Sequence, residues 1–283
     1  KFSSNRKYSV TKFATSQSVG TLAPILRMTE QTTHIDVGQS KILNLDADDQ
    51  GNFIAFTDNK TVVTNDHNLI IEIDLLFPII RRLDNDTFFI ADSRTDKDNN
   101  GYIFKFSGQL VKSFLAGDGI EDIVVQQDKI VITYFDEGVL GDDGPNNDGL
   151  AVFNFSGEQI FGFNSSKILG NILDCYCICK HGTNRILFYA YTDLKVFELN
   201  LDTFKVESFE TPNDFSGTSA ITSTADKIIF HSSYDDKRSF FSWDRNKKEV
   251  KRFGDYSPGL TGIKNGKFLI YGDSGYTIID PTE

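Results

Sequence analysis

The chain has 283 residues, of which 39% are apolar and 24% are charged, and its formal net charge is −11. These values are typical of a globular protein that is long enough to build a core without disulfides. The acidic excess argues against nucleic acid as a partner. The longest apolar run, residues 69–80, contains Glu72 and Asp74 and is too short and too charged to span a bilayer.

The first part of the chain, residues 1–24, is rich in Ser, Thr and Lys and is expected to be a leader or linker. The numbered sequence begins with Lys1 instead of Met, which together with this polar segment favours an exported protein in the periplasm or at the cell surface. The three cysteines favour the alternative, a cytoplasmic protein, because free thiols are more common there.

A repeated unit then runs along the chain. In each copy a tight turn is followed by an apolar strand that closes on Asp. The six copies are residues 51–58, 86–92, 127–136, 184–193, 225–235 and 265–273. Strands of this kind, bounded by Gly, Asn and Asp, are typical of antiparallel β-structure.

A second hairpin follows each of the first five copies. Its final apolar residue is Ile73, Phe114, Phe163, Phe209 and Phe253 in turn, so the unit recurs every 41 to 49 residues. Four short strands at this period predict the blades of a β-propeller.

The sixth copy ends after three strands, which would leave an open sheet edge. We expect the spare segment Ile25–Val37 to supply its outer strand. Residues 25–283 are then predicted to be a single all-β domain, a six-bladed propeller with four-stranded antiparallel blades. Its repeat length and strand order resemble the six-bladed β-propellers in the general style of the TolB-like and NHL-like groups.

All three cysteines lie in one stretch, Asp174–His181, on alternate residues. Aligned with blade three, Cys175 takes the place of Ile123 and Cys177 that of Val125. We therefore expect an inner strand with buried thiols, because Cys packs as a small hydrophobe. A metal site completed by His181 and a reactive thiol are the alternatives, although a straight strand holds three such sulfurs too far apart for one zinc.

The segment Asp96–Ile103 fits the spacing of a calcium-binding loop. Asp96, Asp98 and Asn100 could turn around one cation while Gly101 allows the sharp bend. Calcium is therefore a possible cofactor. The alternative is an ordinary polar loop, because Ser107 stands where the last acidic ligand of such a loop would fall.

The longest insertion, Asp136–Leu150, occupies the same place in the next blade. Its acidic residues are candidates for ligand binding: Asp136, Glu137, Asp142, Asp143 and Asp148. Loops between the second and third strands of neighbouring blades emerge on one face, so the two insertions should form one acidic rim. The Asp that closes each second strand is expected to be a turn device, because Asp accepts hydrogen bonds from nearby backbone N–H groups.

No nucleophile elbow, phosphate-binding loop or zinc-protease motif occurs in the sequence. We therefore favour a non-catalytic recognition module, a monomer that binds a protein, peptide or glycan through its acidic loops or its channel mouth. The alternative is a metal-dependent hydrolase of the lactonase or esterase type. That enzyme would need carboxylates near the inner strands to converge on the channel, and the candidates are Asp46, Glu121, Asp122 and Asp174.

Overall fold

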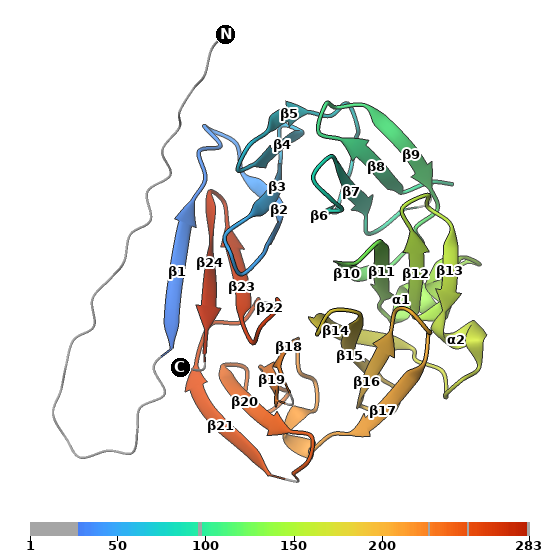
Figure 1. Cartoon of the computed structure of the whole chain (residues 1–283), viewed down its shortest axis with the longest axis vertical. Coiled ribbons are helices and arrows are strands. Elements are labelled where there is room, and N and C mark those ends of the chain that lie inside the picture. The colour runs from blue at the N-terminus through green and yellow to red at the C-terminus, as the bar shows by residue number, and fades with distance from the viewer. Residues whose placement is uncertain (1–27, 96–97, 226, 248, 282–283) are drawn as a thin grey trace, which may run out of the picture.

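The structure is a computed structural model that describes residues 28–95, 98–225, 227–247 and 249–281. Six antiparallel sheets of four strands each surround a central channel, as Figure 1 shows. The prediction of an all-β, six-bladed propeller is confirmed. The predicted leader, residues 1–24, lies outside the described residues.

Each blade runs from an inner strand at the channel to an outer strand at the rim. Blade 1 contains β2 (Ile42–Ala47), β3 (Phe53–Thr57), β4 (Thr61–Thr64) and β5 (Asn68–Ile70). Blade 2 contains β6 (Pro78–Arg82), β7 (Thr87–Asp92), β8 (Gly101–Lys105) and β9 (Leu110–Phe114). Blade 3 contains β10 (Ile120–Gln126), β11 (Lys129–Tyr134), β12 (Leu150–Asn154) and β13 (Gln159–Gly162).

The second half of the ring repeats this order. Blade 4 contains β14 (Asp174–His181), β15 (Arg185–Tyr191), β16 (Lys195–Asn200) and β17 (Val206–Glu210). Blade 5 contains β18 (Ala220–Thr224), β19 (Lys227–His231), β20 (Ser239–Asp244) and β21 (Val250–Asp255). Blade 6 contains β22 (Thr261–Gly262), β23 (Phe268–Gly272), β24 (Gly275–Asp280) and β1 (Thr29–His34).

Blade 6 closes the ring with strands from both ends of the chain. β1 pairs antiparallel with β24 over six residues, from Thr29 opposite Asp280 to His34 opposite Gly275. Figure 1 shows β1 along the outer side of β24. The predicted closing strand is therefore confirmed, and it covers the edge that the three C-terminal strands leave open.

Six apolar clusters form the core, one between each pair of neighbouring blades. Because every blade is covered on both faces, its second strand is buried on both sides and has a nearly continuous apolar sequence. All five residues of β3 are buried, for example. The outer strands instead expose several side chains, as in β9.

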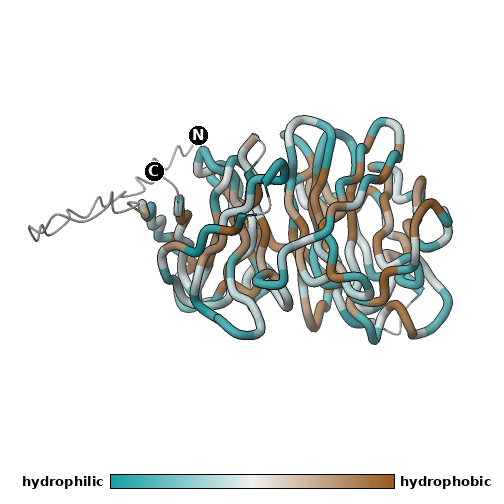
Figure 2. Tube along the Cα trace, turned by 90° about the horizontal axis from the view of Figure 1, so that it is seen from below, coloured by the Kyte–Doolittle hydropathy of each residue, from teal (hydrophilic) through white to brown (hydrophobic). Residues whose placement is uncertain are grey.

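The loops divide the molecule into two faces. We call loop face the side that carries the links between the second and third strands, including residues 93–100 and 135–149, and turn face the opposite side. Figure 2 shows hydrophilic chain at both faces and apolar chain concentrated in the strands between them. The helices are single turns, and four are described: α1 (Asp136–Val139), α2 (Phe163–Ser166), η1 (Pro145–Asp148) and η2 (Asn213–Phe215). None in the described ranges is long and apolar enough to cross a membrane.

Three inner strands contain a β-bulge near their loop-face end. The pairing skips Leu43 in β2, Glu121 in β10 and Tyr176 in β14. A bulge re-aims side chains and shifts their alternation by one residue. These three residues therefore break the two-residue periodicity of their strands.

The strand pairing of β14 corrects the predicted alignment of the cysteines. Cys175 packs with the cluster between blades 3 and 4, whereas Cys177 and Cys179 pack with the cluster between blades 4 and 5. Cys175 is therefore equivalent to Ile120 and Cys177 to Asp122, so the expected matches with Ile123 and Val125 were wrong. β10 and β14 contain the bulge at equivalent positions, so the error came from matching the two strands three residues out of register. All three thiols are nonetheless free and buried, as predicted.

We expect the closing strand to determine stability. Deletion of residues 1–35 exposes the edge of β24 and should lower the melting temperature and promote association through that edge. Deletion of residues 1–24, which keeps β1, is the matched control and should leave both unchanged. Calorimetry and size-exclusion chromatography measure the two effects, and equal melting temperatures for both truncations would contradict ring closure by β1.

Candidate functional site

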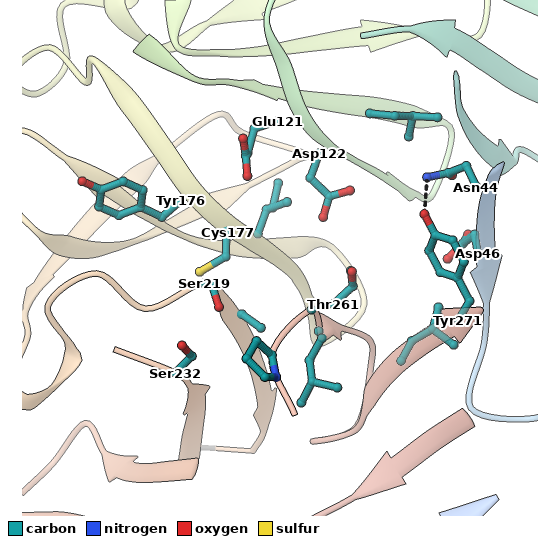
Figure 3. Close-up of a pocket in the computed structure, with 18 of the residues that line it drawn as sticks. Asn44, Asp46, Glu121, Asp122, Tyr176, Cys177, Ser219, Ser232, Thr261 and Tyr271 are labelled. Carbon is teal, nitrogen blue, oxygen red and sulfur yellow. Dashed lines mark hydrogen bonds between the residues drawn. The ribbon is translucent and has the colours of Figure 1, made fainter. Parts of the chain in front are cut away.

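The channel opens on the loop face into a cavity of about 500 Å³. Residues of all six blades line it, chiefly from the first half of each inner strand. Figure 3 shows the polar side chains that face this space: Asn44, Asp46, Glu121, Asp122, Tyr176, Ser219, Ser232, Thr261 and Tyr271. We call this cavity the channel mouth.

A buried ion pair lies at the inner end of the channel mouth. Arg81 Nη2 lies 2.6 Å from Asp122 Oδ1, and their side chains are 9% and 19% exposed. Arg81 also donates to the carbonyl oxygens of Ile123 (2.6 Å) and Ile80 (2.7 Å). Burial raises the pKa of Asp122, and the charge of Arg81 opposes that rise.

The same ion pair separates the two ends of the channel. Arg81, Asp122 and Asp46 also line a second cavity of about 80 Å³, whose other residues belong to the turn-face ends of the inner strands. A ligand that enters from the loop face therefore meets a fixed polar floor.

Glu121 is the acidic group that the bulge of β10 turns toward the channel mouth. Burial within the channel, together with the nearby charges of Asp122 and Asp174, raises the pKa of Glu121 to about 7. Asp174, at the start of β14, has its pKa raised to about 6 by burial and by the charge of Asp136. No cation pairs with either carboxylate among the described residues.

Aromatic side chains also lie at the rim of the channel mouth, and Tyr176 stands beside Glu121 (Figure 3). The hydroxyl groups of Tyr176 and Tyr234 share a hydrogen bond of 2.8 Å between blades 4 and 5. The Lys237 ammonium lies 5.3 Å from the centre of the Tyr234 ring. On the far side, Tyr271 accepts a hydrogen bond from the Asn44 amide. The rim is thus polar and rigidly linked across blades.

Beside the channel mouth, the two predicted insertions come together on the loop face. A groove of about 910 Å³ contains Asp98 from the first insertion and both Asp142 and Asp143 from the second. Asp92, Asp118 and Arg94 also line it, as do the exposed apolar side chains of Leu76, Phe77 and Leu115. The expected acidic rim therefore exists, with an apolar component that the charge pattern did not indicate.

Close backbone packing holds the second insertion in place. A Cβ atom on Gly119 would lie 2.5 Å from the Cα of Gly138, and one on Gly138 would lie 2.4 Å from the Asp118 carbonyl oxygen. Gly119 also has φ +67°, which favours glycine. α1 therefore rests directly on the segment that leads into β10 and Glu121.

The other acidic candidates of this insertion have different surroundings. Glu137 forms an ion pair of 2.7 Å with Arg94. Asp148 is buried, and its carboxylate accepts hydrogen bonds from the Gln159 amide and the Ser165 N–H. Asp136 accepts a hydrogen bond from the Glu137 N–H, and its negative charge raises the pKa of Asp174. Only Asp142 and Asp143 of the five line the groove.

The predicted calcium ligands are only partly described. Asp96 lies outside the described residues, and Asp98 lines the groove. Asn100 is buried, and its amide donates to the carbonyls of Asp92 and Gly117 and accepts from the Ala116 N–H. Calcium binding stays a prediction, which a calcium-dependent rise in melting temperature that Asp98→Asn removes would support.

Two of the Asp residues that end the second strands accept hydrogen bonds from backbone N–H groups of a neighbouring loop. Asp58 accepts from the Lys41 N–H, and Asp92 accepts from the N–H groups of Leu76 and Phe77. These bonds fix the segment that enters the inner strand of the same blade. Within the described ranges, no three His, Cys, Asp or Glu side chains are arranged to hold one metal ion.

Sequence reasoning named the four carboxylates near the inner strands, and the structure brings Asp46, Glu121 and Asp122 into one cavity. It missed Arg81 and the tyrosine pair. Arg81 could have been noticed, because a charged residue inside an apolar inner strand needs a buried partner. The pairing of Tyr176 with Tyr234 depends on the bulge, which has no sequence signal here.

The sequence matches no protein-family model and no curated protein. Similar solved structures include a virginiamycin B lyase from Staphylococcus aureus, 10% identical with a TM-score of 0.51 over 90% of this chain and 99% of that one. A streptogramin B lyase is 8% identical with a TM-score of 0.54, over 89% and 97%. The β-propeller domain of Myceliophteria thermophila Cps50 (Swd1) is 12% identical with a TM-score of 0.53, over 84% and 82%. At these identities the likeness shows the propeller fold alone.

The ion pair in the channel should be essential for stability. Arg81→Leu leaves the Asp122 carboxylate without its partner and should lower the free energy of unfolding by about 3–5 kcal/mol. Arg81→Leu with Asp122→Leu should lose less, because neither charge remains. Lys205→Leu, which removes an exposed pair with Glu207, is the control and should cost less than about 1 kcal/mol. Urea unfolding at pH 7 measures the free energy of unfolding of each variant. An equal loss of stability in Arg81→Leu and in the control variant would refute the argument.

The three thiols should be inert in the folded protein. Cys175, Cys177 and Cys179 are 0%, 6% and 0% exposed, and burial raises the pKa of Cys179 to about 12. We expect no reaction with Ellman's reagent at pH 8 in the native state and three equivalents in denaturant. Rapid native reaction of any thiol would contradict purely structural cysteines.

Proposed function

We propose that this protein is a recognition module that binds a basic peptide segment on its loop face. In this proposal a Lys or Arg side chain of the ligand enters the channel mouth beside Glu121. The observation that carries it is Glu121, a carboxylate that lines an open cavity, lies near the like charge of Asp174 and has no described cation as partner.

The raised pKa values of these two groups give the proposal its energetic basis. Each carboxylate is destabilised in its charged form, by burial and by like charge. A ligand cation would relieve that repulsion and lower both pKa values, so binding should release protons between about pH 5 and pH 8. Affinity should therefore rise with pH across this window.

The surroundings supply contacts for the rest of such a peptide. The groove with Asp142 and Asp143 offers further negative charge, and Leu76 and Phe77 offer exposed apolar surface. The Arg81–Asp122 pair limits the depth to which a side chain can enter. An extended peptide that crosses the face and inserts one cation would use all of these features.

A hydrolase is the second candidate, and Glu121 is the observation that favours it. A carboxylate with a pKa of about 7 in an open cavity has the properties of a general base. The metal-dependent form is less well supported, because the described residues include no three-ligand set. The structural neighbours that are lyases add support for the fold only.

Three expectations from the sequence accompany the proposal. Export to the periplasm or cell surface, the monomeric state and the possible calcium ion stay predictions. A glycan would be the alternative ligand, held by the tyrosine rim in place of the carboxylates.

The test uses a fluorescein-labelled peptide, Gly-Lys-Phe-Lys-Gly, followed by anisotropy in about 50 mM salt. We expect binding that strengthens from pH 5.5 to pH 8 and that Glu121→Gln weakens about tenfold, equivalent to about 1.4 kcal/mol. The variant should also have a shallower pH dependence, because only Asp174 still titrates in this window.

Two controls make the result specific. The peptide with Glu in place of both Lys should not bind, and Glu249→Gln, an exposed carboxylate on the turn face, should behave as wild type. Equal affinity of Glu121→Gln and wild type for the basic peptide would refute the proposed site. Peptide binding by neither protein, with ester hydrolysis lost in Glu121→Gln, would favour the enzyme instead.

A further inference from the structure

The turn face contains a basic cleft in a protein whose net charge is −11. The cleft has a volume of about 480 Å³ and lies where the first turns of blades 4, 5 and 6 meet. Its cationic side chains are Lys180, Arg185, Arg245 and Lys264, and His181 lies beside them. None of the described residues that line it is acidic.

A buried carboxylate beneath the cleft fixes the two arginines. Glu198 of β16 is 7% exposed, and its two oxygens accept hydrogen bonds from Arg185 (2.8 Å) and from Arg245. Arg245 belongs to blade 5, so this bond joins neighbouring blades. Its guanidinium also lies 4.9 Å from the centre of the Phe209 ring, which holds its plane.

One carboxylate cannot neutralise this group of cations. Each guanidinium has five N–H donors, and Glu198 takes only one from each arginine. His181 is hydrogen-bonded through Nδ1 to Ser223 Oγ at 2.9 Å, which orients its ring. The arginines are thus held in position with donors to spare.

The two lysines add positive charge, and neither forms an ion pair with a described acidic side chain. Lys180 is the second-last residue of the inner strand β14, and Lys264 lies in the turn before β23. They also line the small cavity at the turn-face end of the channel, where Asp46, Asp48 and Asp49 lie. The lysines therefore stand between an acidic channel end and the basic cleft.

We propose that this cleft binds a phosphate-bearing ligand with at least two negative charges. Planar guanidinium groups match phosphate oxygens in two-point hydrogen bonds, and ammonium groups add charge without a fixed direction. The cleft volume is within the range that holds a small organic ligand. The pre-set arginines distinguish it from a merely charged surface, because their positions do not have to be ordered upon binding.

The test is isothermal titration calorimetry of the whole chain with inorganic pyrophosphate in about 50 mM salt at pH 7. Wild type should bind, and Lys180→Ala with Lys264→Ala should weaken binding at least tenfold. The lysines are chosen because Arg245→Ala would remove one of the two arginines that neutralise the buried Glu198 and could destabilise the fold. Lys112→Ala, an exposed lysine on β9, is the matched control and should keep wild-type affinity.

A vesicle flotation assay separates the two sources of phosphate. Vesicles with about 20% phosphatidic acid should recruit the protein if the natural ligand is a lipid headgroup, and should not if it is a soluble phosphate compound. The inference is overturned if wild type binds neither pyrophosphate nor these vesicles. It is also overturned if the double lysine variant binds as tightly as Lys112→Ala.

Discussion

The structure depends on the need to cover both faces of every sheet. A single four-stranded blade would expose two apolar faces, and only its neighbours in the ring can bury them. The ring is complete only when the last blade has an outer strand and a neighbour on each side. β1 satisfies this condition by pairing with β24, so strands from near the two ends of the chain contribute to one sheet. Closure of the ring thus makes the stability of each blade depend on all the others.

Ring closure also creates the channel, and the channel imposes its own chemistry. The inner strands converge there, with their loop-face ends around the channel mouth. Space between them is wide enough for polar groups but limits their hydration. Arg81 and Asp122 neutralise one another as an ion pair. Glu121 has no such partner, and burial and nearby negative charge disfavour its ionised form. A charge that is costly in the free protein is the kind of group that a ligand can stabilise.

The repeat made most of the fold predictable, because turns, strand lengths and apolar spacing are local properties that recur in each blade. The closing strand followed from counting strands. Bulges could not be predicted, because skipping Glu121 or Tyr176 depends on packing between blades and not on a local residue signal. For the same reason the sequence identified the channel carboxylates but not their geometry, nor the role of Arg81.

β14 connects the two proposed sites. Its first residues, Asp174 and Tyr176, belong to the loop face, and its last, Lys180 and His181, belong to the basic cleft. The buried cysteines between them anchor the strand on both sides, toward blades 3 and 5. A strand anchored on both sides should keep its position when either ligand binds. We therefore expect the two sites to bind independently, with free energies that add.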